Sequence, residues 1–112
     1  MSQVTTHILD ISKGKPAWGV SVILYEQIAH EWFQLAKGLS NTEGRLNNLL
    51  EEDEELAPGV YKMSFDIKSY FNAEDIEAFY PTIEVIFEVR TMGHYHIPLL
   101  ISPYGYSTYK GT

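Results

Sequence analysis

Residues 94–112 have the sequence HYHIPLLISPYGYSTYKGT, and this stretch is the most informative part of the chain. Chain ends are usually polar and frayed, whereas this one is aromatic and apolar almost to its last residue. Two strands are expected in it, at about 94–101 and 104–109, with a turn at Ser102-Pro103. The stretch therefore predicts a C-terminal end that lies in a packed sheet or lines a functional site.

Strands also dominate the rest of the chain, because its main periodicity is two rather than 3.6. The clearest strand is expected at 83–90, and further strands at 4–10, 18–25, 30–38, just after residue 45 and at 60–66. The segment 18–25 is expected to be largely buried, and 12–16 to be a turn. One helix is predicted over 68–78, where the apolar side chains share a face. Seven or eight short strands and one helix indicate an all-β sandwich of antiparallel strands.

Length and composition limit the possibilities further. The 112 residues suit a single domain, 1–112, and 45% hydrophobic residues argue against disorder. The absence of cysteine excludes disulfides, thiolate nucleophiles and thiolate metal sites. No targeting signal or membrane-spanning run is visible, so a cytoplasmic location is expected.

The net charge of −7 is concentrated in one place, the acidic run at 51–55. Without this run, ten acidic residues face eight basic ones. The run is expected to be a solvated loop, and it lacks the spacing of a calcium-binding loop. An acidic chain with scattered basic residues is also not expected to bind nucleic acid.

Four features are candidates for chemistry: His7 in the first strand, Arg45 after the turn at Gly44, the pair His94 and His96, and the ending Tyr109-Lys110-Gly111-Thr112. In a strand the two paired histidines point to the same face. They would bind zinc or copper if a third ligand converged, although nothing in the spacing supplies one. The alternative is metal-free acid–base chemistry, with histidine as the proton carrier and arginine as the anchor for a planar polar ring.

Several motifs follow one another along nearly the whole chain, namely Thr6-His7-Ile8-Leu9-Asp10, Gly44-Arg45, Gly59-Val60-Tyr61-Lys62, Phe79-Tyr80-Pro81 and residues 94–112. Together they resemble the motifs of the 5-hydroxyisourate hydrolases, a transthyretin-like family of urate breakdown. The resemblance implies an eight-stranded transthyretin-type β-sandwich with one short helix. It also implies a homotetramer, built as a dimer of dimers, with active sites in a channel between dimers.

The implied reaction is hydrolysis of 5-hydroxyisourate to 2-oxo-4-hydroxy-4-carboxy-5-ureidoimidazoline, without metal or other cofactor. Carried over by position, His7, Arg45 and His96 match the family's catalytic residues. Tyr109 matches the family's tyrosine that contacts the substrate, and Lys110 and Thr112 occupy the other two substrate-binding positions of the ending. His94 has a lesser claim, as a neighbour of the site. The resemblance leaves the order of the two catalytic histidines open.

The ending departs from the family pattern, which is Tyr-Arg-Gly-Ser. Lys110 keeps the positive charge but lacks the planar fork of arginine, so it cannot bind in a bidentate manner. Activity is expected to survive, because the other site residues are present. Two alternatives remain, a carrier of small molecules with the same fold and a purely structural module. The polar residues in the predicted site argue against a carrier of apolar ligands.

Overall fold

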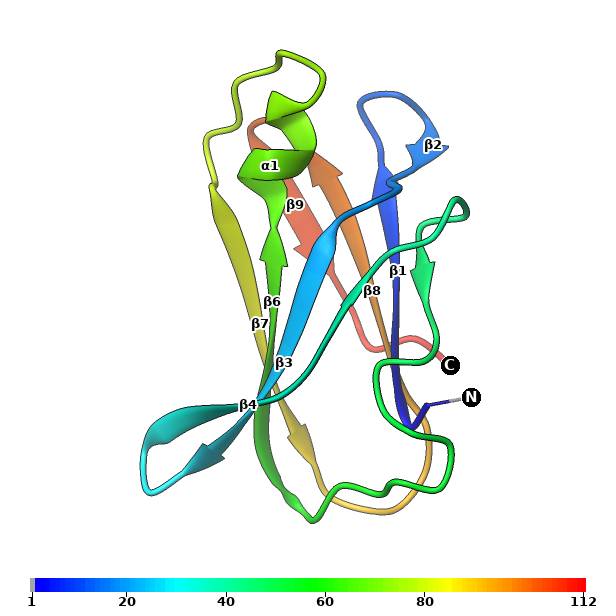
Figure 1. Cartoon of the computed structure of the whole chain (residues 1–112), viewed down its shortest axis with the longest axis vertical. Coiled ribbons are helices and arrows are strands. Elements are labelled where there is room, and N and C mark those ends of the chain that lie inside the picture. The colour runs from blue at the N-terminus through cyan, green and yellow to red at the C-terminus, as the bar shows by residue number, and fades with distance from the viewer. Residues whose placement is uncertain (1) are drawn as a thin grey trace.

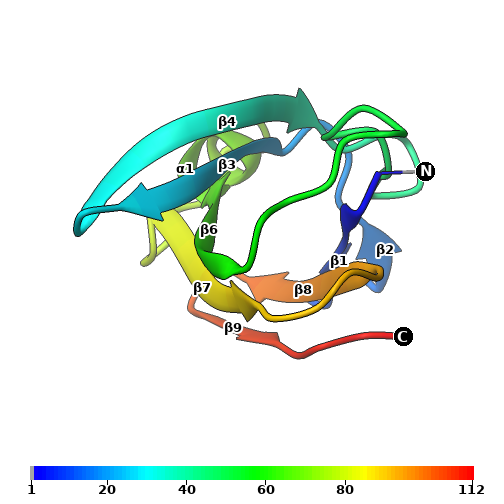
Figure 2. The same ribbon diagram turned by 90° about the horizontal axis from the view of Figure 1, so that it is seen from below.

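Two β-sheets packed face to face form the fold in the computed structural model, which describes residues 2–112 (Figures 1 and 2). The first sheet has the order β2-β1-β8-β9, and β5 also pairs with β1. Its strands are β1 (Val4–Asp10), β2 (Lys15–Pro16), β5 (Arg45–Leu46), β8 (Tyr95–Ser102) and β9 (Gly105–Thr108). The second sheet has the order β4-β3-β6-β7. Its strands are β3 (Ser21–Ile28), β4 (Glu31–Leu39), β6 (Gly59–Asp66) and β7 (Thr82–Val89), and the helix α1 (Ile67–Asn72) follows β6.

The core lies between the sheets and follows from the alternation along the strands. Alternate residues of both sheets are buried and face inward, among them Val4, Ile8, Val22, Leu24, Met63, Phe65, Leu99 and Ile101. Because the pleat has a period of two, the intervening residues of β1, including Thr5 and His7, lie on the outer face of the first sheet. The predicted sandwich with one short helix is confirmed.

One pairing differs from the antiparallel pattern expected throughout. β1 and β8 run parallel, in a continuous register from Val4 opposite Tyr95 to Asp10 opposite Ile101. They lie side by side in Figure 1, at the centre of the first sheet. This pair joins segments about ninety residues apart, so local alternation carries no information on its direction.

The acidic run at 51–55 lies in an exposed loop, as expected from its charge.

The helix is shorter than the predicted 68–78. Asp66 caps its start by accepting a hydrogen bond from the Ser69 backbone N–H at 3.1 Å. Its end is set by Asp75, whose φ of 60° is left-handed. The Ile76 N–H then donates to the Phe71 carbonyl, the bond that closes a Schellman motif. The predicted helix end relies on glycine or proline as the residue that terminates a helix. Asp75 terminates this helix instead, because aspartate also adopts the left-handed conformation.

Two further expectations are wrong in detail. β3 begins at Ser21 rather than 18, and Trp18 is 67% exposed instead of buried. β3 also continues to Ile28, because Ala29 and His30 form a two-residue turn with φ of 52° and 68°. Within the predicted turn at 12–16, Lys15 and Pro16 pair with the end of β1 as the short strand β2.

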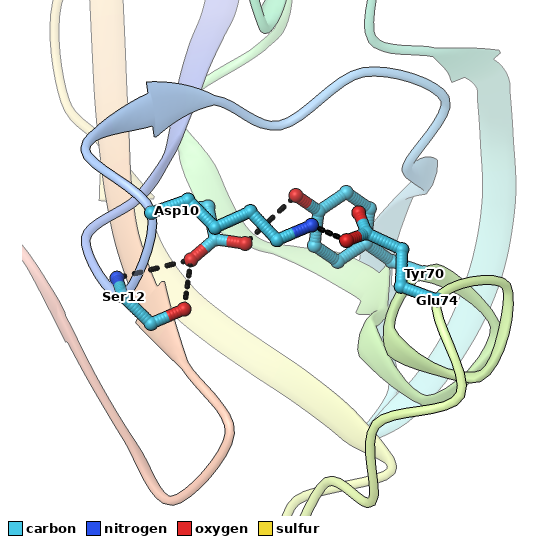
Figure 3. A network of polar contacts seen from close by, with 5 residues as sticks. Asp10, Ser12, Tyr70 and Glu74 are labelled. Carbon is cyan, nitrogen blue, oxygen red and sulfur yellow. Dashed lines mark hydrogen bonds and ion pairs between the residues drawn. The ribbon is translucent and has the colours of Figure 1, made fainter.

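A buried carboxyl group ties the end of β1 to the helix (Figure 3). Asp10 is fully buried and accepts hydrogen bonds from the backbone N–H and hydroxyl of Ser12. It also accepts one from the Tyr70 hydroxyl at 2.8 Å. Burial and this hydrogen bond raise the pKa of Tyr70. Lys13 forms an ion pair with Glu74 beside this contact, so the loop after β1 is held against α1.

The described part of the chain contains no helix with the length and apolar character needed to span a membrane.

Replacing Tyr70 by phenylalanine should lower the free energy of unfolding by about 1–3 kcal/mol, because the buried Asp10 loses a hydrogen-bond donor. Chemical denaturation followed by tryptophan fluorescence measures the difference. Tyr104→Phe is the matched control, since Tyr104 is exposed and its loss of a hydroxyl should change the stability little. Equal stability of the two variants would contradict the structural role of the Asp10 contact.

Candidate functional site

His7 and Arg45 face each other across the β1–β5 pair. The turn before Arg45 is tight: Asn41 Oδ1 accepts hydrogen bonds from the backbone N–H groups of Glu43 and Arg45, both at 2.9 Å. Gly44 has a φ of +75°, and an added Cβ would lie 2.4 Å from the Ile8 carbonyl oxygen. Only glycine therefore allows β5 to approach β1 closely enough to place Arg45 beside His7.

The His7 ring is fixed by one backbone contact. Its Nε2 lies 3.0 Å from the Glu43 carbonyl oxygen. A carbonyl only accepts hydrogen bonds, so Nε2 carries the proton and the lone pair of the neutral ring is on Nδ1. Burial, and then the positive charge of Arg45, lower the pKa of His7 below its usual 6.5. His7 is therefore a neutral ring at neutral pH.

His96 and His94 share one hydroxyl. Thr5 Oγ1 lies 2.8 Å from His96 Nδ1 and 2.8 Å from His94 Nε2. Thr5 stands opposite His96 in the β1–β8 register. The two imidazole rings stack with their centroids 6.0 Å apart, which confirms that they lie on one face.

The environment of His96 resembles that of His7. Burial lowers the pKa of His96, and repulsion between its protonated form and the neighbouring His94, Arg45 and His7 side chains lowers it further. The strand registers place the three predicted catalytic residues on one sheet face, because Arg45 stands opposite His7 and His96 stands opposite Thr5, two residues before His7. Together they form two neutral histidines beside one guanidinium, on the outer face of the first sheet.

The C-terminal tail continues beside β8 after β9 ends (Figures 1 and 2). The Gly111 N–H donates to the His96 carbonyl at 2.8 Å. A Cβ on Gly111 would lie only 2.7 Å from His96 Cδ2. The tail thus packs against the Cδ2 edge of the His96 ring, on the side away from Thr5. Only glycine allows the backbone to approach the ring this closely.

The predicted substrate-binding residues lie in this tail, although not against His7 and Arg45. Tyr109 and Lys110 line a groove of about 610 Å³ together with His96, Tyr95 and apolar residues of β7. Tyr109 is 60% exposed, and Lys110 Nζ lies 5.8 Å from the centroid of the Tyr95 ring. Thr112 is exposed. His96 is therefore the residue that joins the groove to the histidine–arginine cluster.

Sequence reasoning missed Thr5 and the packing role of Gly111. The signal for Thr5 was available, because it lies two residues before His7 and so on the same strand face. Its contact with His96 depends on the parallel pairing, which the sequence did not reveal. Among residues 2–112, no group of three or more His, Cys, Asp or Glu side chains is placed to hold a metal ion.

Comparison with known proteins places this geometry in context. The model of the HIUase/Transthyretin family matches residues 4–111. A 5-hydroxyisourate hydrolase of Salmonella typhimurium is 43% identical over 97% of this chain and 80% of its own length. The 5-hydroxyisourate hydrolase of Mus musculus is 38% identical over 99% of this chain and 96% of its own length.

Solved structures agree on the fold. Sea bream transthyretin in complex with thyroxine matches with a TM-score of 0.92 and 32% identity, over 99% of this chain and 96% of its own. The 5-hydroxyisourate hydrolase of Klebsiella pneumoniae matches with a TM-score of 0.85 and 34% identity, over 97% of this chain and 98% of its own. The predicted transthyretin-type sandwich is confirmed.

The lowered pKa values of His7 and His96 predict how stability depends on pH. As the pH falls through 6.5, the unfolded chain takes up protons that the folded chain does not yet bind, so the free energy of unfolding decreases. It levels off once the folded rings are protonated too. Denaturation between about pH 5 and pH 8 tests this against a double variant, His7→Gln with His96→Gln. The difference between the two proteins should change with pH, and a constant difference would contradict the prediction.

Proposed function

The chain belongs to the HIUase/Transthyretin family, and we propose that it is an enzyme that hydrolyses 5-hydroxyisourate to 2-oxo-4-hydroxy-4-carboxy-5-ureidoimidazoline. One observation supports the proposal: the strand registers place two histidines and one arginine, His7, His96 and Arg45, on the outer face of the first sheet. The names of the curated relatives supply the substrate, and the cluster supplies groups able to act on it.

Each residue has a role that follows from its chemistry. A neutral histidine accepts a proton from water near neutral pH, which makes the water a stronger nucleophile. The water oxygen then bonds to a ring carbonyl carbon, the ring C–N bond breaks, and the departing nitrogen takes up a proton. The Arg45 guanidinium anchors the oxygens of the planar substrate and stabilises the negative charge that develops on them. His7, Arg45 and His96 are thus the proposed catalytic residues.

The tail supplies the proposed substrate-binding residues Tyr109, Lys110 and Thr112. The Lys110 ammonium already lies near the Tyr95 ring within the chain, a cation–π contact rather than a free charge. This contact supports a role of residue 110 that uses its positive charge and does not need the bidentate hydrogen bonds of an arginine. The change from the family's arginine to lysine is therefore compatible with activity.

The alternative to a hydrolase is a carrier of small molecules, and one observation favours it. Sea bream transthyretin, which was solved with thyroxine, has a higher TM-score to this chain than the Klebsiella hydrolase has. Sequence identity speaks the other way, with 43% to a hydrolase against 32% to that transthyretin. A cluster of polar and charged side chains also does not favour an apolar ligand. The assay below separates the two functions.

Purified protein should accelerate the decay of freshly generated 5-hydroxyisourate, followed by its ultraviolet absorbance, above the spontaneous rate. His7→Asn or His96→Asn should each reduce kcat/KM by about 10²–10⁴-fold, the usual contribution of acid–base catalysis. His30→Asn is the matched control, because His30 lies in the exposed β3–β4 turn with a φ of 68° that asparagine tolerates. It should leave the rate unchanged.

If the wild-type protein did not accelerate the decay, the proposed hydrolase function would be wrong and the carrier function would be favoured. Full activity of both His7→Asn and His96→Asn would retain the reaction but refute the assigned site.

We also propose that the chain assembles into a homotetramer, a dimer of dimers. Two observations support it. The cluster lies on an open sheet face, where a second subunit is needed to exclude water. β7 and β9 end their sheets, and unpaired edge strands favour pairing with another chain. Sedimentation equilibrium should therefore give about four times the 12.8 kDa chain mass, and a strict monomer at assay concentration would refute the assembly.

A further inference from the structure

We propose that Thr5 and His94 are positioning residues that hold His96 with its proton on Nε2, so that His96 donates a hydrogen bond to the substrate and His7 is the base. The inference rests on the proposed function for its substrate. It goes beyond that function by giving the two histidines different roles and by assigning roles to Thr5 and His94. The Thr5 hydroxyl and the two ring nitrogens that face it determine these roles.

The Thr5 hydroxyl has a single proton to share between two rings. Its Oγ1 lies 2.8 Å from both His94 Nε2 and His96 Nδ1. The residue is 1% exposed, and its hydroxyl makes no other contact within the described chain. If both rings donated to Oγ1, the hydroxyl proton would be buried without an acceptor, which is costly. If neither ring donated, the hydroxyl could donate its one proton to only one of them. The lone pair of the other ring nitrogen would then face Oγ1 with no proton between them. One ring therefore donates to Thr5, and Thr5 donates to the other.

Two properties of the rings decide the direction. In the order His94 to Thr5 to His96, both rings carry their proton on Nε2, which is the more stable tautomer of an isolated histidine side chain. The reverse order would require the less stable tautomer in both rings. His94 is also exposed, so its Nδ1 lone pair can be solvated by water. A protonated His94 can only donate to Thr5, which gives the same direction. The chain of hydrogen bonds thus ends with Thr5 donating to His96 Nδ1.

The rest of His96 is held for this role. Gly111 closes the Cδ2 edge of the ring, and its backbone N–H binds the His96 carbonyl at 2.8 Å. Nε2 is adjacent to Cδ2 and has no hydrogen bond to any described residue. The Nε2–H group is therefore a fixed donor available to a substrate oxygen, on the same face of the sheet as Arg45. A donor held before the reaction stabilises the charge that forms on that oxygen without reorganisation.

His7 is held in the complementary state. Its Nε2–H donates to the Glu43 carbonyl at 3.0 Å, which leaves the Nδ1 lone pair as the acceptor. In the reaction, His7 Nδ1 takes one proton from the attacking water, and the water oxygen bonds to the carbonyl carbon. The carbonyl oxygen, now negative, is bound by His96 Nε2–H and Arg45. When the C–N bond breaks, the departing nitrogen takes the proton back from His7, so no proton is gained or lost.

Nitrogen-15 NMR of the four histidine rings in the intact protein tests the proposal directly. Long-range proton–nitrogen correlations distinguish a protonated ring nitrogen from one with a lone pair, and the His96→Asn spectrum assigns the signals of His96. The expected result is a protonated Nε2 and an unprotonated Nδ1 in His96, with the same pattern in His7. A protonated Nδ1 in neutral His96 would overturn the proposal.

Substitutions at Thr5 separate positioning from packing. Thr5→Val keeps the shape but removes the hydroxyl, and should lower kcat about 10- to 100-fold, with a much smaller change in KM. Thr5→Ser keeps the hydroxyl and should restore most of the rate. Thr6→Val is the matched control, because Thr6 loses a buried hydroxyl that binds the Ile97 carbonyl on the inner face. It should leave kcat and the His96 spectrum unchanged. An unchanged kcat in Thr5→Val, or no rescue by Thr5→Ser, would overturn the positioning role.

Substitutions at His94 test the direction. His94→Gln retains an N–H donor for Thr5 and should preserve the His96 spectrum and most of kcat. His94→Glu, measured at about pH 8 where a carboxylate only accepts, should force Thr5 to donate to it. His96 must then donate from Nδ1, its spectrum should reverse, and kcat should fall. An identical His96 spectrum in the two variants would refute the proposal. If the wild-type protein does not hydrolyse 5-hydroxyisourate, the proposed function fails, while the spectra still decide the tautomer.

Discussion

Alternation along β1 is the constraint on which the rest of the structure depends. Val4, Thr6 and Ile8 are fully buried, so the core holds the strand in one orientation. Thr5 and His7 must then lie on the opposite face. A shift by one residue would expose the core side chains and bury the histidine. The free energy of burying apolar groups therefore also fixes the place of two polar ones, and the site needs little local stabilisation of its own.

Close backbone approach is the second condition for the site. At Gly44 it lets the arginine strand lie against β1, and at Gly111 it lets the tail lie against His96. Neither glycine contributes a chemical group. Each lets two segments approach closely: Gly44 lies against the Ile8 carbonyl oxygen of β1, and Gly111 lies against the His96 ring.

Much of this could be predicted from the sequence, because most of its signals are local. The alternation predicts nearly all strands to within a few residues, and the motifs around His7, Arg45 and His96 predict the members of the cluster. Three features were beyond it. The helix ends where Asp75 adopts a left-handed conformation, a choice available to several residue types. The parallel partner of β1 and the Thr5 contact that follows from it depend on residues about ninety positions apart. The roles of Tyr109, Lys110 and Thr112 stay a prediction.

The parallel pairing of β1 with β8 has a consequence for how the chain reaches its folded state. β1 is synthesised about ninety residues before β8, so one edge of β1 lacks its main-chain partner until β8 has been made. Contacts between distant segments are also slow to form, because the loop-closure entropy is lost before the contacts stabilise the chain. The second sheet, whose strands follow one another closely, can pair earlier. The Thr5–His96 contact is therefore completed late, and a chain that folds only in part has a sheet but no assembled site.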